Sequence, residues 1–157
     1  MNGYYLWGVV SSGFFLSSIP AIAHQLGIIH KRKKLRSAGT LLEEATQSIS
    51  LNQIFSSYCA VYSFFLFGLV LDSPDPFLTI PRALVGVLLS LIIFELYRER
   101  RSKAAGAAVS VCCLSFILPL LLIVAGMRAS ALAQSCSSIL VCLTTALMAQ
   151  GAWSQYR

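Results

Sequence analysis

Three residues of the third apolar segment have the types and the spacing expected of a polar cavity wall. Arg82, Gly86 and Ser90 recur at every fourth position, so on a helix they lie close to one face. This face offers the charge of Arg82, the space beside Gly86 and the hydroxyl of Ser90. Such a combination suits the binding of a polar solute. A charge this deep in a membrane is costly and often functional. The alternative is that Arg82 extends its charge to the membrane surface.

Pro20 interrupts the first apolar segment and suggests a hinge. Proline has no backbone N–H, so it removes one helical hydrogen bond and bends the helix. In transporters, broken helices let one half move while the other stays packed. We therefore expect a hinge at Pro20 and its neighbour Ala21. The alternative is a static bend that packing tolerates.

Aromatic side chains form a stripe on the second apolar segment. Its members are Phe55, Tyr58, Tyr62 and Phe65. The stripe could cradle a ring-shaped substrate, but packing against helices or lipid is the favoured interpretation. Serines are frequent in the same segment, and small hydroxyl residues let membrane helices approach and bond to each other.

The sequence predicts neither an enzyme nor a metal or cofactor site. It contains no G-x-S-x-G, H-E-x-x-H or phosphate-binding glycine loop. His24 and His30 are six residues apart, so one helix cannot direct both at the same metal. His24 could carry a proton, although an ordinary polar role is favoured. The five cysteines form no C-x-x-C pair, which argues against zinc and disulfides. Glu95 is expected to pair with Arg98.

The composition indicates an integral membrane protein. The 157 residues are 57% hydrophobic and only 11% charged, whereas a soluble domain has about 25% charged residues. The net charge of +6 comes from short basic clusters beside apolar segments, mainly residues 31–36 and 98–103. Such clusters act as topology anchors near anionic lipid, so we expect a lipid partner and no nucleic acid.

The apolar residues fall into five blocks, each long enough to cross a membrane as a helix. We predict helices at about residues 4–29, 51–71, 77–97, 104–127 and 131–153. Two prolines and two aspartates in residues 72–76 predict a tight turn. The first block lacks the basic start of a signal peptide and is expected to be retained.

Short loops set the orientation. Both basic clusters follow odd-numbered spans, so the positive-inside rule places the N-terminus outside or in a lumen and the C-terminus in the cytoplasm. Residues 37–50 contain a possible capping box, with Thr40 as N-cap and Glu43 reaching back. They form either a short helix on the membrane surface or a solvated loop, and the two alternatives have equal weight.

Residues 5–101 resemble one triple-helix unit of the PQ-loop superfamily, which includes the SWEET and SemiSWEET (MtN3-like) sugar transporters. The matching stretches are Ile19-Pro20-Ala21, residues 47–51 at the start of helix two, residues 66–69 at its end, and Leu84-Val85-Gly86 in helix three. The family's Pro-Gln is Pro20-Ala21 here. Its sugar-facing asparagine is replaced by Ala83, next to Arg82, and a frequent tryptophan falls near Ser57.

The resemblance implies an all-α membrane fold with a three-helix bundle at residues 1–101. Residues 102–157 would add a linker helix and the first helix of an incomplete second unit, with Ala149-Gln150 in the motif position. The chain would then be truncated or would complete its pathway by pairing with another copy, and we expect a homodimer. The predicted substrate-binding residues are Arg82, Gly86 and Ser90 from the polar face, and Ala83 and Ser57 from the resemblance.

These observations predict a transporter of a small polar solute that works by alternating access. The solute would be a sugar, an amino acid or a small organic anion, bound near the middle of the membrane between helices one to three. The alternatives are a membrane receptor that binds without flux and an accessory subunit of a membrane complex.

Overall fold

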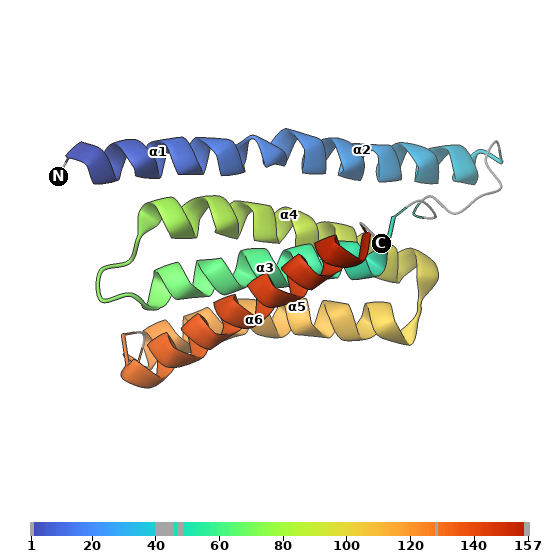
Figure 1. The fold of residues 1–157 in the computed structure, drawn as a ribbon. Helices are drawn as coiled ribbons and strands as arrows, with labels where there is room; N and C mark the ends of the chain where they lie inside the picture. The colour runs from blue at the N-terminus through green and yellow to red at the C-terminus, as the bar shows by residue number, and fades with distance from the viewer. Residues whose placement is uncertain (1, 40–45, 47–48, 128, 156–157) are drawn as a thin grey trace.

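The structure is a computed structural model that describes the chain except residues 1, 40–45, 47–48, 128 and 156–157. Within the described residues the chain forms six helices and no strand (Figure 1). They are α1 (Asn2–Leu16), α2 (Ser18–Ser37), α3 (Leu51–Val70), α4 (Pro76–Arg100), α5 (Lys103–Val124) and α6 (Ala131–Gln155). α1 and α2 run end to end, so five segments are long and apolar enough to cross a membrane. The expected all-α, multi-pass membrane architecture is therefore confirmed at this level.

Short polar side chains cap the starts of three helices. Ser50 accepts a hydrogen bond from the Gln53 N–H at the start of α3, and Ser102 plays the same part for α5. Asp75 accepts from two N–H groups of α4, and Pro76 occupies the first turn, where a missing N–H costs nothing. The predicted turn at residues 72–76 is thereby confirmed.

The first span differs from the prediction in its length and in its continuity. α2 continues to Ser37 instead of ending near residue 29, so the basic run lies inside the helix. Lysine and arginine are good helix formers, and positive charge near a helix C-terminus is favourable. The helix is interrupted at Ser17, three residues before Pro20, because the proline has no N–H to donate to the Leu16 carbonyl. The interruption is slight, since Ser17 keeps helical dihedral angles (φ −62°, ψ −18°) and its N–H still donates to the Gly13 carbonyl at 3.0 Å.

The predicted surface helix at residues 37–50 falls mostly outside the described residues. Its proposed capping pair, Thr40 and Glu43, lies there entirely. Of its ends, Ser37 belongs to α2, and Ile49 and Ser50 are not helical.

α4 lies at the centre of the arrangement, between the α1–α2 rod and α3 (Figure 1). α5 packs against α4 and α3, and α6 crosses α3 obliquely on the side away from the rod. The main core joins α3, α4 and α5. Its buried members are Tyr58, Val85, Leu89, Ile93, Ala108 and Cys112.

A proline inside α4 creates the contact that holds α1. Pro81 has no N–H to donate to the carbonyl of Phe77, four residues earlier. Ser12 of α1 donates its hydroxyl to that carbonyl at 3.1 Å. The Phe77 ring also packs against Gly8, where an added Cβ would come within 2.7 Å of the ring. A backbone defect in one helix is thus satisfied by a side chain of another.

Candidate functional site

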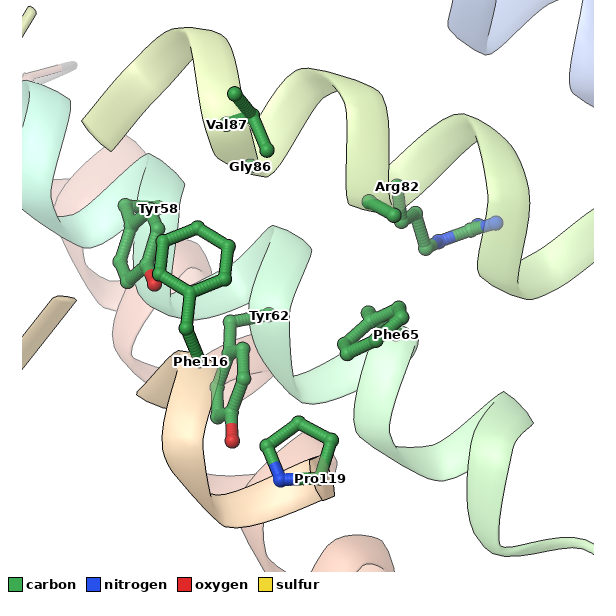
Figure 2. Close-up of a pocket in the computed structure, with 9 residues that line it drawn as sticks. Tyr58, Tyr62, Phe65, Arg82, Gly86, Val87, Phe116 and Pro119 are labelled. Atoms are coloured by element: carbon green, nitrogen blue, oxygen red, sulfur yellow. The ribbon is translucent and has the colours of Figure 1, made fainter. Parts of the chain in front are cut away.

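Three helices of the core surround a partly open cavity of about 180 Å³. α3, α4 and α5 each contribute side chains to it (Figure 2). The lining residues are Tyr58, Tyr62, Phe65, Arg82, Ala83, Gly86, Val87, Phe116 and Pro119. Most of this surface is carbon, so the site excludes solutes that need many hydrogen bonds.

Aromatic rings form the wall that α3 contributes. The rings of Tyr58 and Tyr62 are nearly parallel, with an interplanar angle of 7° and centroids 6.2 Å apart. Phe65 continues the row, 6.1 Å from Tyr62 and tilted by 40°. Phe116 of α5 contributes a further ring (Figure 2). Three members of the predicted aromatic stripe therefore line a cavity, although packing was the favoured interpretation, and Phe55 does not line it.

The two tyrosine hydroxyls of this wall differ in their partners. Tyr58 is hydrogen-bonded to the hydroxyl of Ser115 in α5. Because Ser115 donates its own proton to the Cys112 carbonyl at 2.7 Å, Tyr58 is the donor to Ser115. The buried hydroxyl of Tyr62 has no hydrogen-bond partner among the described residues. An unsatisfied buried hydroxyl costs about 1–3 kcal/mol. The Tyr62 oxygen has almost no accessible surface, so the cavity does not expose it.

Pro119 places a second polar group close to Tyr62. The proline lies inside α5 and has no N–H to donate to the carbonyl of Ser115, four residues earlier. Tyr62 and Ser115 lie close enough to line one groove on the outside of α5. Figure 2 shows the Tyr62 hydroxyl beside Pro119. Tyr62 lines both the cavity and this groove, whereas Ser115 lines the groove and not the cavity.

Arg82 lines the cavity with its stem, while its charge is directed elsewhere. Its guanidinium carbon lies 4.8 Å from the ring centroid of Phe15 in α1 and 5.4 Å from that of Phe64 in α3. It also donates to the Leu78 carbonyl of its own helix at 3.2 Å. Figure 2 shows the side chain leading away from Tyr58 and Phe116. Cation–π contacts of this kind stabilise a charge out of water.

Of the other predicted site residues, two line the cavity and the rest do not. Ala83 and Gly86 line the cavity, whereas Ser57 and Ser90 do not. Ser90 instead donates to the Val87 carbonyl at 2.7 Å. Eight residues of helix turn through about 80° beyond two full turns, which carries Ser90 off the face of Arg82. Pro20 and Ala21 are exposed on α2.

The sequence analysis missed the contribution of α5. It placed the site between the first three spans, whereas Phe116 and Pro119 of the fourth span complete the cavity. A proline inside an otherwise uniform apolar segment was the available signal. Such a residue leaves a free carbonyl wherever it occurs in a helix.

Charged residues gather at the opposite end of α2 from the break, which we call the basic end (Lys33, Arg36, Glu95, Arg98 and Glu99). Glu95 of α4 is nine-tenths buried and forms an ion pair with Lys33 of α2. It also lies 3.6 Å from Arg98, which confirms the predicted pair within α4. Arg36 contacts Glu99 at 3.2 Å. These ion pairs connect α2 to α4.

The described part of the chain contains no cluster of residues that could bind a metal and no disulfide. No three residues of the metal-ligating types lie together there. All five cysteines are free thiols, and only Cys112 is buried. The cavity and the basic end are therefore the candidate sites that remain.

Comparison of the chain with protein-family models, with curated proteins and with solved structures found no match. The resemblance to the PQ-loop superfamily consequently stays a prediction from residues 5–101. The functional argument depends on the geometry of this chain alone.

Proposed function

We propose that the chain is a membrane carrier for a small solute, which it binds in the cavity between α3, α4 and α5. The observation that carries this proposal is a cavity inside a bundle of helices long and apolar enough to cross a membrane, next to a span whose hydrogen bonding is interrupted by Pro20. Carriers bind solutes near the middle of the membrane, beside discontinuous helices that can move.

In this proposal the first span bends at the turn that Pro20 weakens, around Ser17. Phe15 covers the guanidinium of Arg82 and lies two residues before the break at Ser17. Movement of α1 about the break would withdraw Phe15 and uncover one side of the cavity. α2 would meanwhile stay attached to α4 through Lys33 and Arg36. In the alternative movement, these ion pairs would break and α2 would separate from α4, which would open the bundle at the basic end.

Two features of the sequence support the same class of function. The resemblance of residues 5–101 to a transporter unit agrees with a binding site on α3 and α4. The positive-inside rule would place the basic end in the cytoplasm and the N-terminus on the other side. The two movements would then expose the cavity to opposite sides of the membrane. The expected homodimer stays a prediction.

Solute uptake into proteoliposomes tests the proposal. Gly86→Leu places a large side chain at the cavity, and an added Cβ there meets only Val61, at 4.0 Å, so the variant should fold. Gly27→Leu is the matched control, because no atom lies within 4 Å of its added Cβ. We expect uptake of at least one solute from a panel of sugars, amino acids, organic anions and phenols. Gly86→Leu should abolish it and Gly27→Leu should not.

Two results would count against a carrier. Absence of flux for every solute, with folding shown by circular dichroism, would contradict it. Binding that Gly86→Leu removes, without flux in the parent protein, would instead identify a receptor.

A further inference from the structure

We infer that α4 and α5 bind an anionic phospholipid, with its phosphate group at the C-terminal end of α4 and one acyl chain along that helix. The phosphate lies in an open cleft lined by Tyr97, Arg98 and Arg101, which we call the arginine cleft. The inference goes beyond the proposed function and does not depend on it, because a lipid can bind whether or not the protein transports a solute. Three observations support it, namely the charge of the cleft, an exposed apolar stripe on α4, and the distance from the cleft to the cavity.

The arginine cleft has the composition of a phosphate site. Its volume is about 370 Å³, and its three described lining residues include no carboxylate. The Arg98 side chain is 62% exposed, and Arg101 is exposed as well. A guanidinium group binds phosphate through two parallel hydrogen bonds, and a tyrosine hydroxyl can donate another. Two arginines and a tyrosine can therefore donate to one phosphate group together.

The neighbouring carboxylates do not cancel the charge of the cleft. Glu95 lies 3.6 Å from Arg98, but it also forms an ion pair with Lys33. Glu99 contacts Arg36 at 3.2 Å. Each carboxylate thus has a cation of α2 beside it, and the arginine cleft adds positive charge beyond these pairs. The positive-inside rule would place this end of the bundle in the leaflet that is richest in anionic lipid.

The junction of α4 and α5 holds the cleft in shape. Arg101 ends α4 in a left-handed conformation (φ 44°), and its N–H donates to the Tyr97 carbonyl at 2.9 Å. The Tyr97 ring packs against Gly106 of α5, where an added Cβ would lie 3.4 Å from the ring. Backbone hydrogen bonding and helix packing therefore position two of the three lining residues.

An exposed apolar stripe on α4 leads away from the cleft. Val87, Leu91 and Phe94 precede Tyr97 at spacings of three or four residues, so they lie on one face of the helix. Their exposed fractions are 43%, 43% and 45%. The guanidinium carbon of Arg98 lies 6.0 Å from the ring centroid of Phe94. An acyl chain on this stripe would therefore be continuous with a phosphate group at Arg98.

The length of the stripe matches one leaflet of a membrane. Val87 lies ten residues before Tyr97, which corresponds to about 15 Å along the helix. The hydrocarbon core of a bilayer is about 30 Å thick, so one leaflet contributes about 15 Å. Val87 of α4 and Phe116 of α5 also line the partly open cavity (Figure 2). An acyl chain that starts at the arginine cleft therefore ends beside the cavity.

Native mass spectrometry of the purified protein with added lipids tests the inference. Dioleoyl phosphatidylglycerol is the anionic probe, and dioleoyl phosphatidylcholine has the same chains without a net charge. Dihexanoyl phosphatidylglycerol and inorganic phosphate supply the phosphate group without a long chain. We expect the anionic long-chain lipid to bind about tenfold more tightly than the neutral one. The two probes without a long chain should bind much more weakly.

Variants with equal changes in charge locate the headgroup. Arg98→Gln combined with Arg101→Gln should abolish the preference for the anionic lipid. Lys31→Gln combined with Lys34→Gln is the matched control, because it removes two charges from exposed positions of α2, and it should keep most of the preference. Arg98→Lys combined with Arg101→Lys should be intermediate, since the charge remains without the planar fork. Circular dichroism checks that each variant is folded.

A photoreactive lipid tests the path of the acyl chain. Phosphatidylglycerol with a diazirine at the end of one chain should label α4 and α5 near Val87 and Phe116. Labelling confined to α1 or α6 would refute this path.

Three binding results would overturn the inference. Equal binding of the two dioleoyl lipids would show that the headgroup charge is not recognised. An equal loss of the preference in the lysine control would show that general positive charge, and not the arginine cleft, attracts the lipid. Inorganic phosphate that binds as tightly as the long-chain lipid would identify a site for free phosphate. None of these measurements involves flux, so each of these results would leave the proposed function standing.

Discussion

The α1–α2 rod and the body formed by α3, α4 and α5 are both helical and apolar, yet different contacts hold them in place. None of the side chains in the most apolar window of the rod is buried, whereas 33% of the corresponding window is buried in α3 and in α4. The body has a continuous core around Tyr58, Leu89 and Ile93. The rod contacts mainly one neighbour, α4.

The rod is held by one small apolar cluster, in which Ile29 of α2 packs against Ile92 and Leu96 of α4, and by polar contacts from both of its halves. Ser12 bonds to the Phe77 carbonyl in α1, and Lys33 and Arg36 form ion pairs with α4 from α2. Lipid tails are as apolar as leucine side chains. Apolar contacts with protein therefore stabilise a membrane helix little more than contacts with lipid do. Polar groups therefore help to fix the rod beside the Ile29 contact, and each half has its own contacts with α4.

The largest expected difference between the two regions concerns apolar side chains. Ile93→Ala removes a side chain that is 0% exposed in the body, and it should lower the free energy of unfolding by about 2 kcal/mol. This value is at the lower end of the usual range because the alternative surroundings are lipid. Ile28→Ala, at a residue of α2 that is 39% exposed, should change it by less than about 0.5 kcal/mol. Denaturant unfolding in detergent measures both. Equal losses would remove the distinction.

Loss of an ion pair should affect the rod and leave the body intact. Lys33→Met leaves the nearly buried carboxylate of Glu95 without its main partner, although His30 and Arg98 remain nearby. We expect a loss of about 1–2 kcal/mol, less than for a fully buried pair, because Lys33 itself is partly exposed. Hydrogen exchange should accelerate in α2 and stay unchanged in α5.

The matched control for this ion pair is Lys34→Met, on the exposed side of α2. It removes the same charge without removing a contact to Glu95. Faster exchange in α5 after Lys33→Met would show that the rod and the body unfold together.

A smaller effect is expected at the contact between Ser12 and α4. Ser12→Ala should cost about 1 kcal/mol, because the Phe77 carbonyl loses its donor. Ser11→Ala, one residue earlier and exposed, should cost nothing measurable. In a Pro81→Ala background the restored N–H can donate to the same carbonyl, so Ser12→Ala should become nearly neutral. An unchanged cost in that background would show that Ser12 acts in another way.

The smallest effect on stability is expected at the break itself. Pro20→Ala restores a backbone donor at an exposed site, so the free energy of unfolding should rise by only a few tenths of a kcal/mol or stay constant. Flux should fall nevertheless, because a continuous first span couples α1 to α2. Binding of the solute should stay unchanged. Proteoliposome uptake and ligand binding, measured on the same preparation, separate the two effects.

Hydropathy and turn chemistry predicted the spans, because the need to cross lipid and to reverse direction is recorded locally in the chain. Residues 72–76 form the turn as expected, and the apolar blocks become the helices. Which helix faces which could not be predicted in the same way. Lipid-facing and buried positions have similar composition in membrane helices. The aromatic stripe from Phe55 to Phe65 therefore does not show which helix packs against it.

The cavity depends on contacts of this second kind. Tyr58 meets Ser115 from a helix that the sequence analysis assigned to a separate unit. Arg82 was placed correctly along its helix, but the rings that receive its charge come from α1 and α3. Periodicity locates a residue on its own helix, and the tertiary structure decides what it meets.

The attachment of the rod to α4 also has a consequence for biogenesis. The groups that receive the first span, the Phe77 carbonyl and the carboxylates of Glu95 and Glu99, all belong to a helix made later by the ribosome. The first span must therefore enter the bilayer and wait there, surrounded by lipid, until α3 and α4 have been inserted. Its final docking is a step between helices already in the membrane, and a nascent chain that stops before α4 contains no site to receive it.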